Sequence, residues 1–366
     1  MRTTPRAPSR GRGGKYLGAI ALGVALAASL TGLTAVAAPR PAERLPVFDG
    51  MTNRPENGPG TNILLLGTDS RAGITKAEKE RFSTGSVGCN CSDTIMLIHV
   101  SPRQDRVSVV GLPRDSHAII PAHRDRATGA TRAAHPAKLN AAYAEGGPRL
   151  AVRTIERMTK VRIDRYLEID FRRFIDSVNQ VGGVRVCTPR PLKDFATKLD
   201  LPPGTHHLTG GQSLQYVRSR HVDSSADFGR IQRQQRFLVG VLRTLSADRA
   251  FADPLRTARL ARAVLGSSRV DQGFTVDQLA SLAMALRELS PSRIEFTTVP
   301  VRGFSAPQEG IGATLDWDTS RAAKVFGALS KDRAFDGRKS AAAPSDPPRL
   351  GSREIFHGDK VACDGG

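Results

Sequence analysis

The chain has 366 residues and a formal net charge of +19, with 54 Lys and Arg against 35 Asp and Glu. This length accommodates one to three domains. A protein this basic could bind nucleic acid, an anionic membrane surface or a phosphate-rich substrate. Where the basic residues lie along the chain decides between these partners.

The N-terminus combines a basic segment with an apolar one. Residues 1–15 carry four arginines and Lys15, and no acidic residue occurs before Glu43. Residues 16–38 are uncharged, and as a helix they would extend about 35 Å, enough to cross a bilayer. Positive charge before the span predicts a cytoplasmic tail, a single transmembrane anchor and an extracytoplasmic remainder.

A cleaved signal peptide is the alternative to a retained anchor, because residues 35–37 (Ala-Val-Ala) fit a small-x-small cleavage site. Both possibilities export the domain. Export argues against DNA binding, so no nucleic-acid partner is expected.

The two flanks of the central region differ from it in composition. Residues 39–60 are rich in Pro, Gly, Asn and Arg, which predicts a juxtamembrane linker. Residues 331–366 are rich in Pro, Ser, Gly and charge, which predicts a disordered tail. The folded domain is therefore expected at 61–330.

The first elements of this domain are predicted to be strands. Residues 62–67 form a short apolar run that a glycine stops, as in a buried strand. Residues 94–100 and 107–112 are β-rich runs separated by a short polar segment, which predicts a hairpin and hence a mixed sheet. Residues 72–92, between the first two runs, are polar and are expected to be an insertion.

Helices and strands then alternate to the end of the domain. Helices are expected at 139–145, 148–159, 171–181, 210–217, 227–245, 253–265, 275–288 and 319–329, and strands at 166–169, 184–187 and 294–300. This alternation predicts an α/β fold with a mixed central β-sheet flanked by helices on both faces.

Four cysteines in an exported chain permit disulfides: Cys89, Cys91, Cys187 and Cys363. Cys89 and Cys91 lack the C-x-x-C spacing of zinc knuckles and redox sites, which favours a disulfide over a metal–thiolate site. We expect Cys89 or Cys91 to pair with Cys187. Cys363 is then left over or pairs with the remaining insertion cysteine.

Arg and Asp gather where the apolar runs end. Three loops carry them, at residues 69–71, 92–93 and 113–115, and ligands collect at such strand ends in open α/β sheets. A second cluster begins at residues 218–221 (Arg-Ser-Arg-His) and continues along one helix face through Asp227, Arg230, Arg233 and Gln234.

Several arginines with two or three aspartates are the combination expected for a diphosphate and a divalent cation. Guanidinium groups match phosphate oxygens, and carboxylates hold Mg²⁺ that substrate phosphates share. Surface salt bridges are the alternative for any single pair. Ser70 and Ser92 are expected to be turn or cap residues, and the sequence has no G-x-S-x-G, H-E-x-x-H or G-x-x-x-x-G-K-[ST] motif.

Six segments follow one another within residues 61–245: NILLLGTDSR, SDTIMLIHV, VVGLPRDS, KLNAAYAEGGP, VGGVRVCTPRPLKD and YVRSRH…DFGRIQRQQRFL. In this order they resemble the LytR-CpsA-Psr family of cell-wall glycopolymer transferases. The resemblance implies a mixed sheet flanked by helices and a hydrophobic tunnel for a polyprenyl tail. It also implies transfer of a glycan phosphate from a polyprenyl-diphosphate carrier to a peptidoglycan hydroxyl, with Mg²⁺ (or Mn²⁺).

The resemblance also assigns roles to residues. Asp69 and Asp93 correspond to the metal-side carboxylates, and together with Arg114, Arg220 and Arg230 they form the expected catalytic set. The diphosphate-binding residues that it implies are Arg71, Arg114, Arg218, Arg220, Arg230 and Gln234. The insertion at 72–92 departs from the family's simplest pattern, between the two expected metal ligands.

The expected function is that of a phosphotransferase in the cell membrane with an extracytoplasmic catalytic domain. Two alternatives stay open: a carrier-lipid diphosphatase, in which water replaces the acceptor, and a non-catalytic protein that holds anionic envelope polymers. A transcriptional regulator is disfavoured, because no helix-turn-helix is visible and the domain lies on the wrong side of the membrane.

Overall fold

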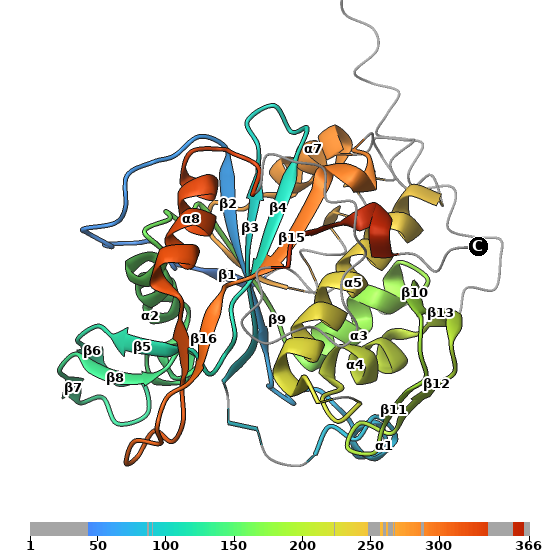
Figure 1. Ribbon diagram of the computed structural model, residues 1–366, viewed down its shortest axis with the longest axis horizontal. Coiled ribbons are helices and arrows are strands. Elements are labelled where there is room, and N and C mark those ends of the chain that lie inside the picture. Colours follow the sequence, from blue (N-terminus) through green and yellow to red (C-terminus); the bar gives the residue numbers. More distant parts are fainter. Residues whose placement is uncertain are drawn as a thin grey trace, which may run out of the picture. The chain divides into compact units, whose positions relative to one another are not determined.

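An eight-stranded mixed sheet forms the centre of the structure (Figure 1). The computed structural model describes residues 43–85, 88–89, 91–222, 224–247, 257–258, 261–262, 266, 268–286, 289–335 and 354–361. In sheet order the strands are β1 (Glu43–Leu45), β14 (Arg269–Asp271), β9 (Arg165–Ile169), β2 (Thr61–Thr68), β3 (Ser92–Val100), β4 (Val107–Gly111), β15 (Ile294–Thr298) and β18 (Phe356–His357).

The central strands confirm the predicted hairpin and mixed sheet. β3 pairs antiparallel with both β2 and β4, whereas β2 pairs parallel with β9 and β4 pairs parallel with β15. The apolar side chains of β2 alternate between two buried clusters, with Leu64 in one and Ile63 in the other. Both faces of the sheet are therefore covered, and a near-continuous apolar run is the sequence signal of such a strand.

Helices pack on both faces, as predicted (Figure 1). On one face, α2 (Ala141–Thr159) and α8 (Thr319–Ser330) contribute Ile155 and Val325 to the cluster that holds Leu64. On the other, α5 (Ala226–Ala247) contributes Val239 beside Phe296. Among the described residues, the other α-helices are α1 (Lys76–Arg81), α3 (Phe171–Gln180), α4 (Gly210–Arg218) and α7 (Val276–Leu286).

Short strands pair in small sheets outside the central one. They are β5 (His117–Ile120) with β8 (His135–Lys138), β6 (His123–Arg124) with β7 (Thr131–Arg132), β10 (Val184–Thr188) with β13 (Gly204–Leu208), β11 (Leu192–Asp194) with β12 (Leu199–Leu201), and β16 (Val301–Phe304) with β17 (Leu315–Trp317). The strand predicted at 184–187 therefore exists but does not belong to the central sheet.

The two segments expected to be irregular supply the two edge strands. β1 comes from the predicted linker 39–60 and pairs with β14, and β18 comes from the predicted tail 331–366 and pairs with β15. The tail prediction was wrong for residues 331–335 and 354–361, and the linker prediction was wrong for β1. Strand pairing gives hydrogen-bond partners to backbone groups that would otherwise bond to water. In β18 the Phe356 ring also stacks on Phe296, with the ring centroids 5.2 Å apart.

Several predictions fall on residues outside this description. The basic tail 1–15 and the span 16–38 lie outside it, as does most of the helix expected at 253–265. Within the ranges given above, no helix has the length and apolar character needed to span a membrane.

Candidate functional site

The predicted site loops meet at one edge of the central sheet. Because β3 runs antiparallel to its neighbours, its first residues lie beside the ends of β2 and β4: Thr68 pairs with Ser92, and Met96 pairs with Gly111. Asp69 directly follows β2, Asp93 is the second residue of β3, and Arg114 follows β4 by three residues.

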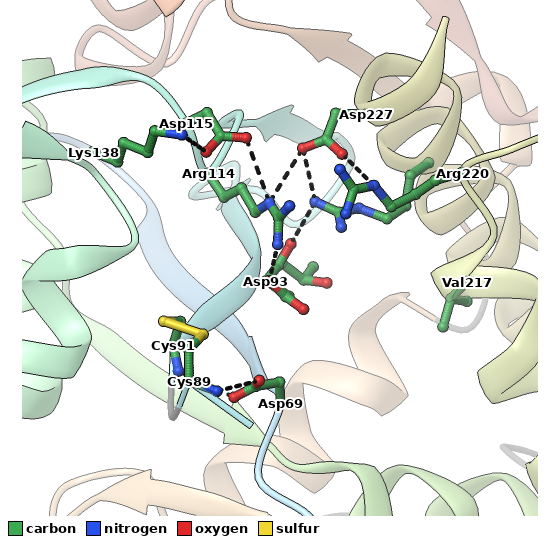
Figure 2. A network of polar contacts seen from close by, with 12 residues as sticks. Asp69, Cys89, Cys91, Asp93, Arg114, Asp115, Lys138, Val217, Arg220 and Asp227 are labelled. Carbon is green, nitrogen blue, oxygen red and sulfur yellow. Dashed lines mark hydrogen bonds and ion pairs between the residues drawn. A yellow bond between two sulfur atoms is a disulfide. The ribbon is translucent and has the colours of Figure 1, made fainter. Parts of the chain in front are cut away.

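One carboxylate joins three of the predicted arginines (Figure 2). Asp227 lies in the first turn of α5, with Oδ2 3.1 Å from Arg230 Nη2 and 3.3 Å from Arg114 Nε, and Oδ1 2.8 Å from Arg220 Nε. Arg114 Nη1 also lies 2.5 Å from Asp93 Oδ1. We call these five residues the Asp227 cluster. It brings together segments that are more than 100 residues apart in the sequence.

Burial and charge compete in this cluster. Burial alone would raise the pKa of Asp227, but the charges of Arg230, Arg114 and Arg220 outweigh it and hold that pKa below its usual value. Burial lowers the pKa of Arg230 to about 10, so the group stays charged at neutral pH. The Arg230 side chain is 5% exposed.

The Nε–H group of Arg230 is a buried donor without an acceptor among the described residues. Arg230 Nη2, by contrast, donates to Asp227 and to the backbone oxygen of Asp93. A buried guanidinium N–H without an acceptor is costly. An anionic ligand with several oxygens, such as a phosphate, would satisfy it.

Asp194, at the end of β11, holds the loop that carries Arg220. Its Oδ2 accepts the backbone N–H groups of Arg220 at 2.6 Å and His221 at 2.9 Å, and its Oδ1 accepts from Ala196 and Thr197. Sequence reasoning gave Asp194 no role, although it is the last residue of the VGGVRVCTPRPLKD segment. Only that segment match could have drawn attention to it.

Gln234 connects three elements. Its Nε2 donates to Thr94 Oγ1 on β3 at 2.8 Å and to the Val217 carbonyl on α4 at 3.3 Å. Its amide therefore joins α5 to β3 and α4 in this structure, and a direct role in binding diphosphate stays a prediction.

Asp115 and Lys138 extend the cluster toward the β5–β8 pair. Asp115 Oδ1 lies 3.0 Å from Lys138 Nζ, and its Oδ2 lies 3.5 Å from Arg114 Nε. Neither residue was among the predicted site residues. Both nevertheless lie within matched segments, VVGLPRDS and KLNAAYAEGGP.

Asp69, Arg71 and Arg218 form a second group beside the first. Arg71 Nη1 lies 3.5 Å from Asp69 Oδ2, and the guanidinium groups of Arg71 and Arg218 lie 5.7 and 4.8 Å from the Phe171 ring. Burial lowers the pKa of Arg218, the charge of Arg71 lowers it further, and Asp93 partly opposes both. The negative charge of Asp93 therefore stabilises arginines of both groups, Arg114 in the first and Arg218 in the second. The second group, with two arginines and one aspartate, carries a net positive charge.

The cysteines near Asp69 bond to each other. Asp69 Oδ2 accepts the Cys89 N–H at 2.9 Å and Oδ1 accepts the Cys91 N–H at 3.1 Å (Figure 2), and the Cα atoms of the two cysteines lie 5.1 Å apart. The predicted pairing of Cys89 or Cys91 with Cys187 was therefore wrong. Cys187 is also disulfide-bonded, and Cys363 lies outside the described residues.

The carboxylates of Asp69 and Asp93 suit Mg²⁺ in their chemistry. Asp69 Oδ1 accepts one backbone N–H and keeps a second lone pair, whereas Oδ2 accepts the Cys89 N–H and also lies 3.5 Å from Arg71 Nη1. Asp93 Oδ1 engages Arg114, whereas Oδ2 has neither a hydrogen bond nor an ion pair with any described residue. Carboxylate oxygens are the ligands that Mg²⁺ prefers, so the residues fit the predicted ion.

Comparison with known proteins covers most of the described residues. The sequence model of the LytR_cpsA_psr family matches residues 34–331. The chain is 34% identical over 275 residues to the probable cell wall biosynthesis protein LcpB of Corynebacterium glutamicum, covering 75% of this chain and 62% of that protein. It is 30% identical over 226 residues to the polyisoprenyl-teichoic acid–peptidoglycan teichoic acid transferase TagV of Bacillus subtilis, covering 60% of this chain and 53% of that protein.

A solved structure has the same fold. The LytR-Csp2A-Psr enzyme from Actinomyces oris superposes with a TM-score of 0.58 at 22% identity, covering 80% of this chain and 97% of that one. The chain spans about half to three fifths of the length of the curated relatives that it matches. The match over residues 34–331 and the shared fold show that the chain belongs to the LytR_cpsA_psr family.

Proposed function

We propose that this protein is an extracytoplasmic phosphotransferase that moves a glycan phosphate from a polyprenyl-diphosphate carrier to peptidoglycan. The observation that carries the proposal is the convergence of Arg114, Arg220 and Arg230 on Asp227 at the sheet edge where Asp93 also lies. The printed name of TagV, a teichoic acid transferase acting between a polyisoprenyl carrier and peptidoglycan, supports the same reaction class.

The arginines would bind the diphosphate and stabilise the charge that the leaving polyprenyl phosphate develops. Arg220 is the most accessible of the three, with a side chain 38% exposed, and Arg230 brings an unsatisfied buried donor. Asp227 positions the three guanidinium groups, which would otherwise repel one another. Arg71 and Arg218 would hold the more distant phosphate oxygens.

Mg²⁺ (or Mn²⁺) would be held by Asp69 and Asp93, whose donor atoms fit it. When bound, such an ion neutralises charge on the diphosphate oxygens that it shares with the protein. Asp93 then serves two purposes, since its Oδ1 orients Arg114 while its Oδ2 remains available.

The proposed location is the cell membrane, with the apolar segment 16–38 as the anchor and the domain outside. A polyprenyl carrier resides in the same bilayer, so an anchor would keep the domain near its lipid substrate. The hydrophobic tunnel for the polyprenyl tail stays a prediction of the family resemblance.

Product analysis tests this proposal. The full chain in detergent should be incubated with a polyprenyl-diphosphate glycan, peptidoglycan and Mg²⁺, and the products weighed by mass spectrometry. The proposal predicts glycan phosphate covalently bound to peptidoglycan together with polyprenyl phosphate. Glycan phosphate released at the same rate without peptidoglycan would instead identify a diphosphatase, and no Mg²⁺-dependent product would indicate a polymer-binding protein.

A further inference from the structure

Two histidines lie in the segment from β5 to β8 (residues 117–138), which we call the β5–β8 excursion. Their Nε2 atoms both lie close to one carboxylate oxygen of Glu145 on α2. His123 Nε2 lies 3.2 Å and His135 Nε2 lies 3.0 Å from Glu145 Oε2. β5 to β8 lie beside α2 (Figure 1), and the segments that carry these residues are all within the described ranges. None of the three residues belongs to the proposed transferase site.

The hydrogen bonds of the two imidazoles fix their tautomers. His123 Nδ1 lies 2.9 Å from the Pro121 carbonyl, and His135 Nδ1 lies 3.0 Å from the Ala133 carbonyl. A carbonyl can only accept, so each Nδ1 carries the hydrogen, and in a neutral ring each Nε2 is then a lone pair. This Nδ1–H···O=C arrangement is the one that orients metal-bound histidines.

Three buried acceptors therefore face one another. His123 Nε2, His135 Nε2 and Glu145 Oε2 are all buried and lack a hydrogen bond of acceptable geometry within the described residues, and the His123 side chain is 6% exposed. Such a cluster is unfavourable without a cation among its members. In a tetrahedral site with metal–ligand bonds of about 2.1 Å, ligand atoms lie roughly 3.4 Å apart. The separations of His123 Nε2 and His135 Nε2 from Glu145 Oε2, 3.2 and 3.0 Å, are close to that.

Asp125 supplies a fourth ligand. Its ligand atom and those of His123 and Glu145 all lie within 4.8 Å of one another. Asp125 Oδ1 is occupied by the N–H groups of Ala127 and Thr128 and by the Thr128 hydroxyl. Oδ2 is left for a cation, and the turn that these bonds build holds the carboxylate in place.

A cation already approaches this position. Arg132 Nη1 lies 3.1 Å from Glu145 Oε2 and 3.4 Å from Asp125 Oδ2, bridging the two carboxylates. The Arg132 side chain is 44% exposed, so it can turn into solvent without burying its charge. A divalent ion in its place would balance the two carboxylates and would also give both imidazole lone pairs a partner, which a guanidinium cannot do.

We propose that His123, Asp125, His135 and Glu145 bind a divalent transition-metal ion of the zinc class, which fastens the β5–β8 excursion to α2. Two imidazoles with two carboxylates favour zinc over Mg²⁺, and four protein ligands are typical of a structural site. The β5–β8 excursion ends at Lys138, whose ion pair with Asp115 holds that carboxylate beside Arg114. A bound ion would therefore reduce the mobility of residues next to the Asp227 cluster.

The test is zinc binding by the full chain, purified without a histidine tag and stripped with a chelator. Wild type should bind one zinc per chain by elemental analysis, and Co²⁺ should give the visible absorption of a four-coordinate site. His123→Gln/His135→Gln should weaken zinc binding by about 100-fold or more. Arg132→Gln should bind zinc at least as tightly as wild type, because it removes the competing cation.

His206→Gln is the matched control, since His206 is a partly exposed histidine whose Nε2 contacts the Pro202 carbonyl on a different hairpin. It should bind zinc like wild type. Zinc should also raise the melting temperature of wild type but not of the double variant, which keeps the test valid if that variant is less stable. Absence of zinc binding by wild type, equal binding by the double variant, or loss of binding in Arg132→Gln would each overturn the proposal. None of these outcomes bears on Mg²⁺-dependent transfer.

Discussion

Asp227 and Arg230 lie one turn apart on α5, with Arg230 Nη2 3.1 Å from Asp227 Oδ2, and both side chains are largely enclosed. The pair is therefore different from an exposed helix ion pair. Asp227 also balances Arg114 and Arg220, so removing it leaves three arginines close together without their shared counterion.

Asp227→Asn and Arg230→Met should each lower the free energy of unfolding by about 3 kcal/mol, because each leaves a buried charge unpaired. The double variant should lose less than the sum of the two, with a coupling of about 1–3 kcal/mol. Denaturant melts of the four proteins provide the comparison. Additive losses would mean that the two side chains do not stabilise each other.

The same pair predicts a pH dependence. The pKa of Asp227 is lowered in the folded protein, so the ionised carboxylate contributes stability above the unfolded value of about 3.8, and this contribution is lost as pH falls through the folded pKa. The stability difference between wild type and Asp227→Asn should therefore be constant from pH 7 to about pH 5 and shrink below pH 4. A difference that grows as the pH falls would contradict this assignment.

Much of this site could be predicted from the sequence because its signals are local. The apolar run at 62–67 and the hairpin at 94–112 fix which loops share a sheet edge, and Arg114 and Asp93 lie directly at those strand ends. The tertiary pairing of Asp227 with Arg114 and Arg220, which lie on other elements, leaves no such mark in the spacing. The role of Asp194 is equally invisible, because it consists of accepting backbone N–H groups.

The edges of the sheet escaped prediction for a related reason. β1 and β18 have three and two residues, too few to show any periodicity, and each pairs with a strand far away in the sequence. The Cys89–Cys91 pairing was missed because Asp69 accepts the backbone N–H groups of both cysteines, which spacing alone does not reveal.

The disulfide can be checked by peptide mass. Trypsin should release residues 82–103 as one fragment containing both Cys89 and Cys91. Without reduction this fragment should be lighter by two hydrogens than after reduction, and it should not be linked to the peptide that contains Cys187. A cross-linked fragment joining Cys187 to Cys89 or Cys91 would restore the pairing first expected from the sequence.

The membrane topology makes a separate prediction. The basic residues 1–15 before the apolar run 16–38 predict a retained anchor with its N-terminus inside. Protease added to intact protoplasts should digest the domain and leave a short membrane-embedded stub. Release of the intact domain into the medium would indicate cleavage after Ala37, and protection of the domain would refute the extracytoplasmic location.

The central claim is that the Asp227 cluster binds the diphosphate, and Arg220 tests it most directly. Arg220 is the most exposed of the three arginines, so Arg220→Ala should lower the melting temperature by only about 3 °C or less. Mg²⁺-dependent transfer to peptidoglycan should fall by about 100-fold or more, and Arg220→Lys should recover only part of it. Arg321→Ala is the control, because Arg321 forms an exposed pair with Asp318 on α8. The proposal predicts that turnover separates Arg220→Ala from Arg321→Ala while their melting temperatures agree. Near-wild-type turnover in Arg220→Ala, or a loss that unfolding fully explains, would contradict it.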